Sequence, residues 1–480
     1  MAGENLRSRA KRGFIWNTVE RLVTNGMQFI ITVILARLLS PDDYGVIAMP
    51  AIFLAFAQVL IDSGFANALI RKTDLNEKDL STAFYFNILV GLACYIVLFL
   101  SSPLIATFFK TPILSKLLKV TALVIFINSL GIVQQALMTK RMDFKTQAVI
   151  SVISTLVSGT IGIWMAYNGY GVWSLVFQQV SAASIRTVLL WILGHWHPIR
   201  VWSKESFHYL WSFGNKVVII GFLDTIYNNI YSFVIGKLYN AKDLGNYTRA
   251  QQFADLPVNN IGGIIQRVTL PLLSEIQDDN NRLSYIYLSI IRMTSIIIIP
   301  LMFGLAAIAN PLIMVLLGEE WLGCVLLFQI LCIARIWTPF NGINGNLLQV
   351  KGRTDLQLKL EIAKKIMITI VLACTIMGGV VSLVIGFAIC TFFAFIINTY
   401  YTKRLIGISF FKQIQAIIPS LIISFVMALI IMLVNMIIKN IYIELIVDIT
   451  IGGLMYYVLS YLFEKDSLME LKSLVIKRNN

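Results

Sequence analysis

Charged residues are scarce in this chain. Only 13% of its 480 residues are Asp, Glu, Lys or Arg, whereas 58% are apolar and the mean hydropathy is +0.78. Soluble domains contain roughly 45–50% apolar residues, and so few charges could not cover a soluble fold. Apolar runs such as Ser295–Ala309 and Ser420–Val434 belong to regions near the ~20 residues that span a bilayer. The composition therefore predicts an all-α, polytopic membrane protein.

Cysteine is also scarce. The five cysteines are odd in number, lie far apart and all fall in apolar segments: Cys94, Cys324, Cys332, Cys374 and Cys390. We interpret them as small apolar side chains within helices and expect neither a disulfide framework nor a metal site. We expect no cofactor.

Motifs of ATP-driven pumps and of enzymes are missing. No GxxxxGK[ST] run occurs, which argues against an ATP-driven pump. The spacing supports no Ser/His/Asp or paired-carboxylate arrangement, and no loop is long enough for the catalytic domain of a membrane glycosyltransferase. The run His195–His197, close to Pro198 and Trp202, is interpreted as an anchor at the membrane interface. We therefore expect that the protein is not an enzyme.

Basic residues outnumber acidic residues by 39 to 25, a formal net charge of +14. In a membrane protein, basic cytoplasmic loops explain this excess more simply than nucleic-acid binding does. The basic N-terminal segment precedes an apolar segment that contains Glu20 and Arg21 and lacks a small-residue cleavage pattern. This pattern predicts an uncleaved first span rather than a signal peptide.

Hydropathy and turn signals predict about fourteen transmembrane segments, with twelve as the alternative count. The segments begin near residues 14, 44, 82, 114, 147, 171, 212, 244, 284, 322, 357, 380, 411 and 440. Basic residues gather in alternate loops, which predicts an even number of spans and cytoplasmic termini. The loops assigned to the cytoplasmic side contain Arg71, Lys72, Lys78, Lys140, Arg141, Lys145, Arg200, Lys204, Lys351, Arg353, Lys403, Arg404 and Lys412.

An internal repeat spans most of the chain. The stretch ARLLSPDDYG (Ala36–Gly45) returns as GKLYNAKDLG (Gly236–Gly245), and GVWSLV at 171–176 returns as GVVSLV at 379–384. Pro41 cannot extend a helix and Asp side chains can accept freed backbone N–H groups, so each stretch is interpreted as a hairpin between spans. We predict two parallel six-span repeats, 1–200 and 201–408, with two extra spans in 409–480. Parallel repeats are typical of transporters, with the substrate path at their interface.

Polar residues recur at helical spacing in the first two spans of each repeat. The stripes are Asn17, Arg21, Thr24 and Gln28; Gln58 and Asp62; Asp224, Asn228 and Tyr231; and Arg249, Gln252, Asn259 and Gln266. Polar residues within a membrane usually face a cavity, so these four spans are predicted to line a polar chamber. In the competing interpretation, Arg21 and Arg249 are ion-pair partners that hold helices together. Further single charges occur in later spans: Arg186, Arg292, Arg335, Glu361, Lys364 and Lys365.

The first two spans and their repeat resemble the polysaccharide flippases of the multidrug/oligosaccharidyl-lipid/polysaccharide exporter superfamily. The residues that carry the resemblance are Trp16 with Glu20 and Arg21, the stretch Leu35–Gly45, and the counterpart Ile235–Ala250. The resemblance covers about residues 8 to 460 and is more specific in the first two spans than elsewhere. It implies two six-helix lobes in a V plus two C-terminal helices. It also implies movement of an undecaprenyl-diphosphate-linked oligosaccharide across the cytoplasmic membrane of a bacterium.

The polar stripes suit such a cargo. Arg21 and Arg249 are the predicted phosphate ligands. The predicted sugar ligands are Asn17, Gln28, Asn228, Tyr231, Gln252 and Asn259. The last two spans would supply an apolar flank for the lipid tail, and Asp62 and Asp224 are the candidate carboxylates for ion coupling.

Two other functions stay open at this stage. A cation-coupled drug antiporter of the same superfamily would have twelve spans and acidic ion sites, whereas the stripes here include arginines. A non-transporting membrane scaffold would not need paired polar stripes. The expected partners are the lipid-linked oligosaccharide, membrane lipids, and a polysaccharide polymerase with its chain-length machinery, but no nucleic acid.

Overall fold

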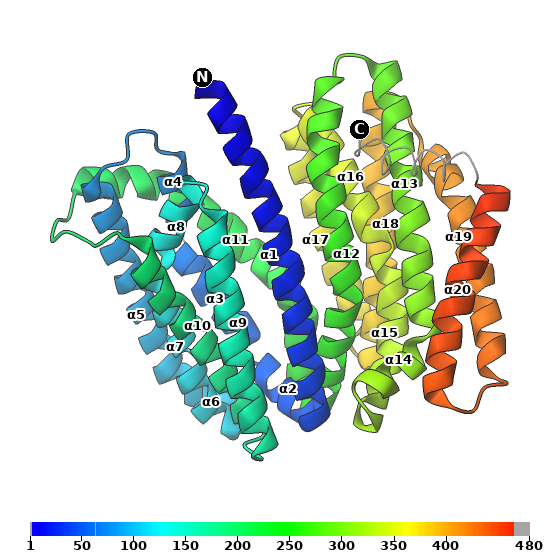
Figure 1. The fold of residues 1–480 in the computed structure, drawn as a ribbon, viewed down its shortest axis with the longest axis horizontal. Helices are drawn as coiled ribbons and strands as arrows, with labels where there is room; N and C mark the ends of the chain where they lie inside the picture. Colours follow the sequence, from blue (N-terminus) through cyan, green and yellow to red (C-terminus); the bar gives the residue numbers. More distant parts are fainter. Residues whose placement is uncertain (1, 63, 465–480) are drawn as a thin grey trace. The chain divides into compact units, whose positions relative to one another are not determined.

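The computed structural model describes residues 2–62 and 64–464, and within these residues the chain is helical throughout (Figure 1). The helices of the first part are α1 (Ala2–Leu38), α2 (Pro41–Ala48), α3 (Ala51–Asp62), α4 (Phe65–Arg71), α5 (Glu77–Phe108), α6 (Ile113–Thr121), α7 (Leu123–Ser129), α8 (Ile132–Lys140), α9 (Phe144–Tyr167), α10 (Trp173–Gly194) and α11 (Lys204–Leu238). They are followed by α12 (Ala241–Glu275), α13 (Asn280–Ala307), α14 (Ala309–Leu316), the 3-10 turn η1 (Glu319–Trp321), α15 (Leu322–Arg335), α16 (Trp337–Val350), α17 (Thr354–Thr375), α18 (Gly379–Ile406), α19 (Phe410–Asn435) and α20 (Ile441–Phe463).

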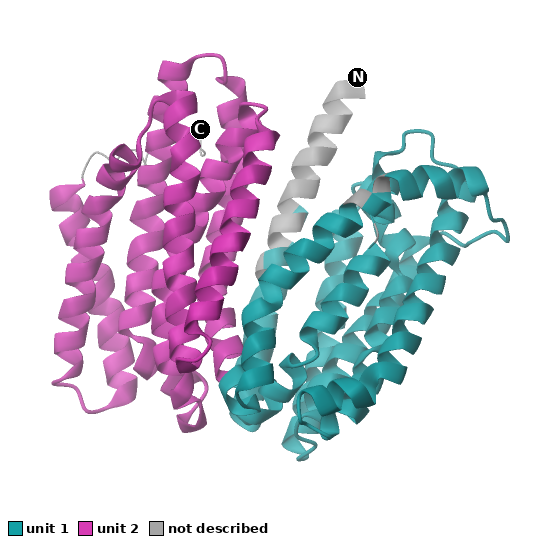
Figure 2. Cartoon of the chain, turned by 180° about the vertical axis from the view of Figure 1, so that it is seen from behind, with its two compact units in different colours: residues 1–245 teal, residues 246–480 magenta. Residues whose placement is uncertain are grey.

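The chain divides into two compact units, residues 1–245 and 246–480 (Figure 2). Helix α11 packs against α3, α4 and α5 and therefore belongs to the first unit, although the sequence repeat places it at the start of the second copy. Helix α12 begins at the end of the first unit and continues into the second. The predicted limits at residues 200 and 408 describe the sequence repeat and stay a prediction.

The helices have the length and the surface of membrane spans. Of the described segments, ten are long and apolar enough to cross a membrane, and two bent helix pairs raise the number to twelve. Large side chains such as Leu100 and Leu104 of α5 are 69% and 74% exposed, as a lipid-facing surface requires. Helices α12 and α17 have 35 and 22 residues but are too polar to enter this count. The polytopic, all-helical fold is confirmed, whereas the number fourteen stays a prediction.

The stretch Ala36–Gly45 forms the expected hairpin. Helix α1 ends at Leu38 and α2 begins at Pro41, with a bend of 119° between them. The Ser40 N–H donates to Oδ2 of Asp43 at 3.1 Å, and the Asp43 N–H donates to Oγ of Ser40 at 3.3 Å. This capping box satisfies two N–H groups that the helix start leaves free, while Pro41 has no N–H to satisfy. The predicted roles of the proline and the aspartate are confirmed.

The repeated hairpin, Gly236–Gly245, contacts the first one. An ideal Cβ on Gly45 would lie 1.7 Å from the carbonyl oxygen of Ala241, and one on Gly245 would lie 1.8 Å from that of Pro41. Because positions 41 and 45 match 241 and 245 in the repeat, the two contacts are reciprocal. The recurrence of glycine at 45 and 245 therefore has a physical cause: two backbones touch there, and no side chain fits.

The backbone also bends at recurring positions. Three positions with a positive φ in the first copy have counterparts with a positive φ in the second, and in each case the later residue is glycine. The matched pairs are Lys110 and Gly318, Gly171 and Gly379, and His195 and Gly407. The first two pairs lie 208 positions apart, the spacing of the GVWSLV and GVVSLV runs. These positions end or separate helices, where a positive φ is common.

The two helices outside the repeat attach to α13. Helix α19 packs along α13, and α20 packs against α19 at the edge of the second unit (Figure 1, orange and red). Met427, Ala428 and Ile431 of α19 are buried together with Ala307. The Tyr456 hydroxyl of α20 donates to the carbonyl oxygen of Ile296 at 2.7 Å. The repeat and the extra helices of the second unit thus share one apolar core.

Candidate functional site

The polar face of α1 carries an arginine that stays accessible. The side chains of Arg21 and Gln28 are exposed, and Thr24 between them is half-buried. The neighbouring Glu20 accepts a hydrogen bond from the Ser151 hydroxyl of α9 at 2.8 Å. Within the described part of the chain, no carboxylate lies within ion-pair distance of Arg21. The side chain of Asn17 lies outside the described residues.

A short chain of amides leads to Asp62. The Asn128 Nδ2 of α7 donates to Oε1 of Gln58 at 3.3 Å, and Gln58 Nε2 donates to Oδ1 of Asp62 at 2.9 Å. Gln58 also lines a cavity of 230 Å³ together with Thr121 and Gln179. Gln58 and Asp62 lie one helical turn apart, and this hydrogen bond joins their side chains. Asn128 and Gln179 join them from helices that the stripe analysis did not single out.

The stripe on α11 divides into an accessible part and a buried part. Asp224 and Asn228 are exposed, whereas Tyr231 is only 5% exposed. The three residues share a helical face by spacing, but the C-terminal part of that face packs inside the first unit. Tyr231 is therefore less accessible to a ligand than Asp224 and Asn228.

The stripe on α12 contains an acidic residue that the sequence analysis missed. Arg249 and Gln252 are half-buried and Asn259 is exposed, while Asp255 lies between them on the same helix. Nη2 of Arg335 in α15 donates to Oδ2 of Asp255 at 3.0 Å, and Nε lies 2.5 Å from Oδ1.

The guanidinium of Arg335 also lies 4.9 Å from the centre of the Phe387 ring of α18. Arg335 thus fits the interpretation of a residue that joins helices. The sequence could have indicated Asp255 as a member of this stripe, because it lies three residues after Gln252. Its partner lies 80 residues further along the chain, too far for a sequence pattern to indicate.

The other single charges differ in their surroundings. Arg186 of α10 and Arg292 of α13 are exposed. Lys364 forms an ion pair with Glu361 one turn earlier in α17. In residues 2–62 and 64–464, no group of three or more His, Cys, Asp or Glu residues is placed to hold a metal ion.

A buried polar network joins four helices of the second unit. Oδ1 of Asn344 in α16 accepts from the Tyr287 hydroxyl of α13 at 2.8 Å and from the Thr402 hydroxyl of α18 at 2.7 Å. Its Nδ2 lies 3.4 Å from Oε1 of Gln413 in α19. All four side chains are at most 1% exposed. Because nothing can reach them, this network connects α19 to the repeat and is not a binding site.

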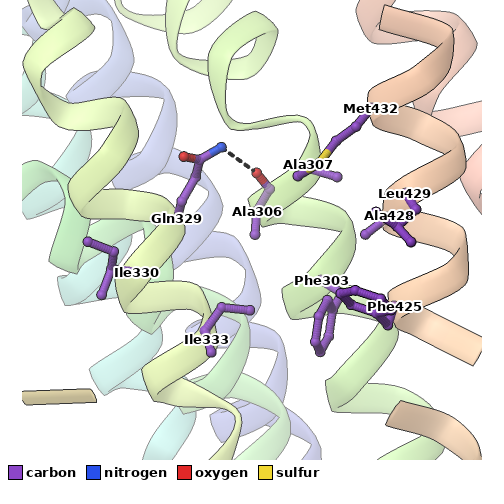
Figure 3. A pocket seen from close by; sticks show the side chains of 10 residues that line it. All are labelled: Phe303, Ala306, Ala307, Gln329, Ile330, Ile333, Phe425, Ala428, Leu429 and Met432. Carbon is purple, nitrogen blue, oxygen red and sulfur yellow. Dashed lines mark hydrogen bonds between the residues drawn. The ribbon is translucent and has the colours of Figure 1, made fainter. Parts of the chain in front are cut away.

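An apolar cavity of 280 Å³ lies between α13, α15 and α19 (Figure 3). Its walls include Phe303 and Phe425, whose rings are 6.4 Å apart, and the side chain of Met432. Gln329 is the one polar side chain among the described residues of the wall, and it donates from Nε2 to the carbonyl oxygen of Ala306 at 3.1 Å (Figure 3). With that amide bonded to the backbone, the cavity suits a hydrocarbon chain.

Comparison with known sequences identifies similar proteins over most of the chain. The model of a family described as "Polysaccharide biosynthesis protein" matches residues 34–326. An "Uncharacterized membrane protein in cps region" of Klebsiella pneumoniae is 30% identical over 396 residues, 80% of each chain. The teichuronic acid biosynthesis protein TuaB of Bacillus subtilis is 26% identical over 415 residues, 86% of each chain.

Comparison with solved structures identifies a similar fold. The structure named "Lipid II flippase MurJ, inward closed conformation" matches with a TM-score of 0.76 and 18% sequence identity. The match covers 95% of this chain and 100% of that one. At this level of identity the similarity establishes the fold alone.

Proposed function

The chain belongs to the polysaccharide biosynthesis protein family, and from this premise we propose that it moves a lipid-linked oligosaccharide of the undecaprenyl-diphosphate type across the cytoplasmic membrane of a bacterium. The names of its relatives and the fold it shares with a lipid II flippase support a flippase. The observation that carries the proposal is Arg21, an exposed guanidinium in a membrane helix without an ion pair among the described residues. Transport proceeds by alternating access.

Arg21 binds the diphosphate. A guanidinium is planar and always charged, and it holds two oxygens of a phosphate at once. Arg21 lies two residues before Val23, where the part of α1 that is apolar enough to cross a membrane begins, and this is the depth of a lipid headgroup. Among the described residues no carboxylate forms an ion pair with it, and the adjacent Glu20 is hydrogen-bonded to the Ser151 hydroxyl instead. Arg249 is the second phosphate ligand in this proposal.

Amide side chains bind the sugars. Gln28, Asn228 and Asn259 are exposed on their helices, and amides both donate to and accept from sugar hydroxyls. Asn17, Gln252 and Tyr231 complete the proposed set. Tyr231 contributes less than the others, because only 5% of it is exposed.

The apolar cavity between α13, α15 and α19 holds part of the lipid tail. The apolar flank for the lipid tail that we expect from the last two helices is thus provided by α19, through residues such as Phe425 and Met432. Asp62 and Asp224 are the proposed ion-coupling carboxylates. Asp62 is the better supported, since its carboxylate ends the chain of amides from Asn128.

We propose that both termini lie in the cytoplasm. The basic loops that contain Lys78, Lys140 and Lys204 would then face inward and the two hairpins outward. Single cysteines at the exposed positions Asp42, Lys242 and Glu319 should react with an impermeant maleimide in intact cells. Cysteines at Lys78 and Lys204 should react only after permeabilisation. Labelling of position 42 from the cytoplasm alone would contradict this topology.

Deletion of the gene tests the function. A strain without the protein should accumulate the lipid-linked oligosaccharide on the cytoplasmic leaflet and should lose the surface polymer, and the wild-type gene should restore both. A drug antiporter would instead change drug susceptibility and leave the leaflet distribution normal. A scaffold for the polymerase and chain-length machinery would lose polymer without trapping the oligosaccharide inside. Either result would refute the flippase proposal.

A further inference from the structure

A second cavity, of 890 Å³, lies in the second unit where α17, the end of α18 and the start of α19 meet. Its size is within the roughly 300–1,000 Å³ typical of ligand sites. It involves none of the residues assigned to the oligosaccharide. Three cations line it, Lys359 of α17 and Lys403 and Arg404 of α18.

The cavity has a positive charge that no lining carboxylate cancels. None of the described residues that form its walls is Asp or Glu. The two carboxylates nearest in sequence on α17 are already paired, Asp355 with Arg353 at 2.9 Å and Glu361 with Lys364. In the part of the chain that the structure describes, Lys359, Lys403 and Arg404 form no ion pair. An anion is therefore the complementary ligand.

The start of α19 adds to this potential. Ser409, Phe410 and Phe411 line the cavity, and they form the N-cap and the first two positions of a 26-residue helix. The N–H groups at a helix start have no carbonyl partner within the helix and favour a negative group. The Ser409 hydroxyl accepts from the Lys412 N–H, which keeps this start in place after the left-handed turn at Gly407.

The rest of the lining is aromatic and aliphatic. The Arg404 guanidinium lies 4.6 Å from the centre of the Tyr400 ring, and Phe411 is 79% exposed. Leu360 and Ile396 form the apolar side of the cavity. Aromatic rings beside Lys and Arg are typical of the membrane interface. The ligand must therefore combine an anionic head with hydrocarbon chains.

We propose that this cavity is a binding site for an anionic phospholipid of the leaflet that the basic loops predict to be cytoplasmic. The phosphate group contacts Lys403, Arg404 and the start of α19, and Lys359 approaches it from α17. The acyl chains lie along Leu360 and Ile396. The bound lipid connects the last helix of the repeat to the first helix outside it. Basic pockets between membrane helices bind anionic headgroups in this manner.

Lipid retention by the purified full-length protein tests the site. Native mass spectrometry with added phosphatidylglycerol should detect a bound lipid on the wild type, whereas phosphatidylcholine should bind at least tenfold more weakly. The variant Lys359→Gln/Lys403→Gln/Arg404→Gln should lose roughly 100-fold in affinity for phosphatidylglycerol. The matched control Lys78→Gln/Arg200→Gln/Lys204→Gln removes the same charge from exposed positions of the first unit and should bind as the wild type does.

Several results would overturn the proposal. Equal losses in the triple variant and the control would indicate general electrostatic attraction, and equal binding of the two lipids would exclude headgroup recognition. Full displacement by inorganic phosphate would indicate a free-anion site. The variant Arg404→Lys, which retains the charge, should retain most of the binding, and its loss would contradict the charge argument. Because no transport is measured, these outcomes do not depend on the flippase proposal.

Discussion

One arginine of the first unit and one of the second are held in different ways. Arg21 of α1 is exposed and forms no ion pair with a described residue, whereas Arg335 of α15 is held by Asp255 and packs over Phe387. A cation with a carboxylate partner stabilises the packing of helices, while a cation without one is available to an anionic ligand. Arginine thus serves two purposes in this protein, helix packing and availability to a ligand. The side chains around each arginine determine which purpose it serves.

The hairpins, by contrast, are alike in both copies. Each has a side-chain cap at its helix start and a glycine that touches the backbone of the other hairpin. A mutation that acts on this shared feature should affect both copies equally. A mutation of Arg335 should instead lower stability, whereas a mutation of Arg21 should lower transport at normal stability.

The largest effect is expected at the two glycines. Gly45→Ala and Gly245→Ala would each place a Cβ within 2 Å of a carbonyl oxygen, which forces the hairpins apart. We expect each to lower the free energy of unfolding by about 3 kcal/mol, the upper part of the range for overpacking, seen as a loss of folded protein in the membrane. Gly26→Ala is the control, because a Cβ there meets nothing within 4 Å; it should be neutral or stabilising. Wild-type abundance of both hairpin variants would show that the backbones do not touch.

Next in size is the ion pair of the second unit. Arg335→Ala should cost about 3 kcal/mol of stability, because it leaves Asp255 partly buried without its partner. The double variant Arg335→Met/Asp255→Leu should recover most of this loss, since an apolar pair carries no desolvation penalty. Thermal unfolding in detergent measures both. If the double variant is as unstable as Arg335→Ala, the arginine has another structural role.

Replacement of Arg21 in the first unit should lower transport and leave stability unchanged. Arg21→Ala should remain at normal abundance and lose most of the polymer output, roughly 10–100-fold, as expected for about 1.5–3 kcal/mol of charged hydrogen bonding. Arg21→Lys should lose only part. The control Arg186→Ala removes another exposed membrane arginine of the same unit and should be active.

The competing role for Arg21 has its own outcome. If Arg21 is an ion-pair partner, Arg21→Ala should reduce the amount of folded protein, and Glu20→Gln/Arg21→Ala should repair it. Measuring membrane abundance together with polymer output separates the two roles. Normal output from Arg21→Ala would eliminate phosphate binding.

The smallest effects are expected at the left-handed positions. Lys110 and His195 have a positive φ where the second copy has Gly318 and Gly407. Lys110→Gly and His195→Gly should each raise stability by about 0.5–1 kcal/mol, because glycine has no Cβ strain in this conformation. Gly407→His should lower it by a similar amount. An unchanged melting temperature in all three variants would contradict the proposed strain.

The sequence by itself determined the features that depend on near neighbours. Hydropathy and helical spacing indicated the membrane helices, since each spans consecutive residues. The Ser40, Pro41 and Asp43 triplet determined a hairpin, because caps act within one turn. The repeat indicated in advance that positions 45 and 245 are equivalent, but not that they touch.

Only the tertiary structure decided which polar residues meet. Asp255 binds Arg335, Asn344 is buried among Tyr287, Thr402 and Gln413, and Tyr231 turns inward while Asn228 on the same face stays exposed. Helical spacing places a residue on a face, but the rotation and neighbours of a helix are set by packing against segments far away in the sequence, such as α9 against α1 and α19 against α13. Packing also formed the basic cavity, because Lys359, Lys403 and the start of α19 come from three helices. The sequence pattern within one helix does not indicate which side chains of neighbouring helices will contact it.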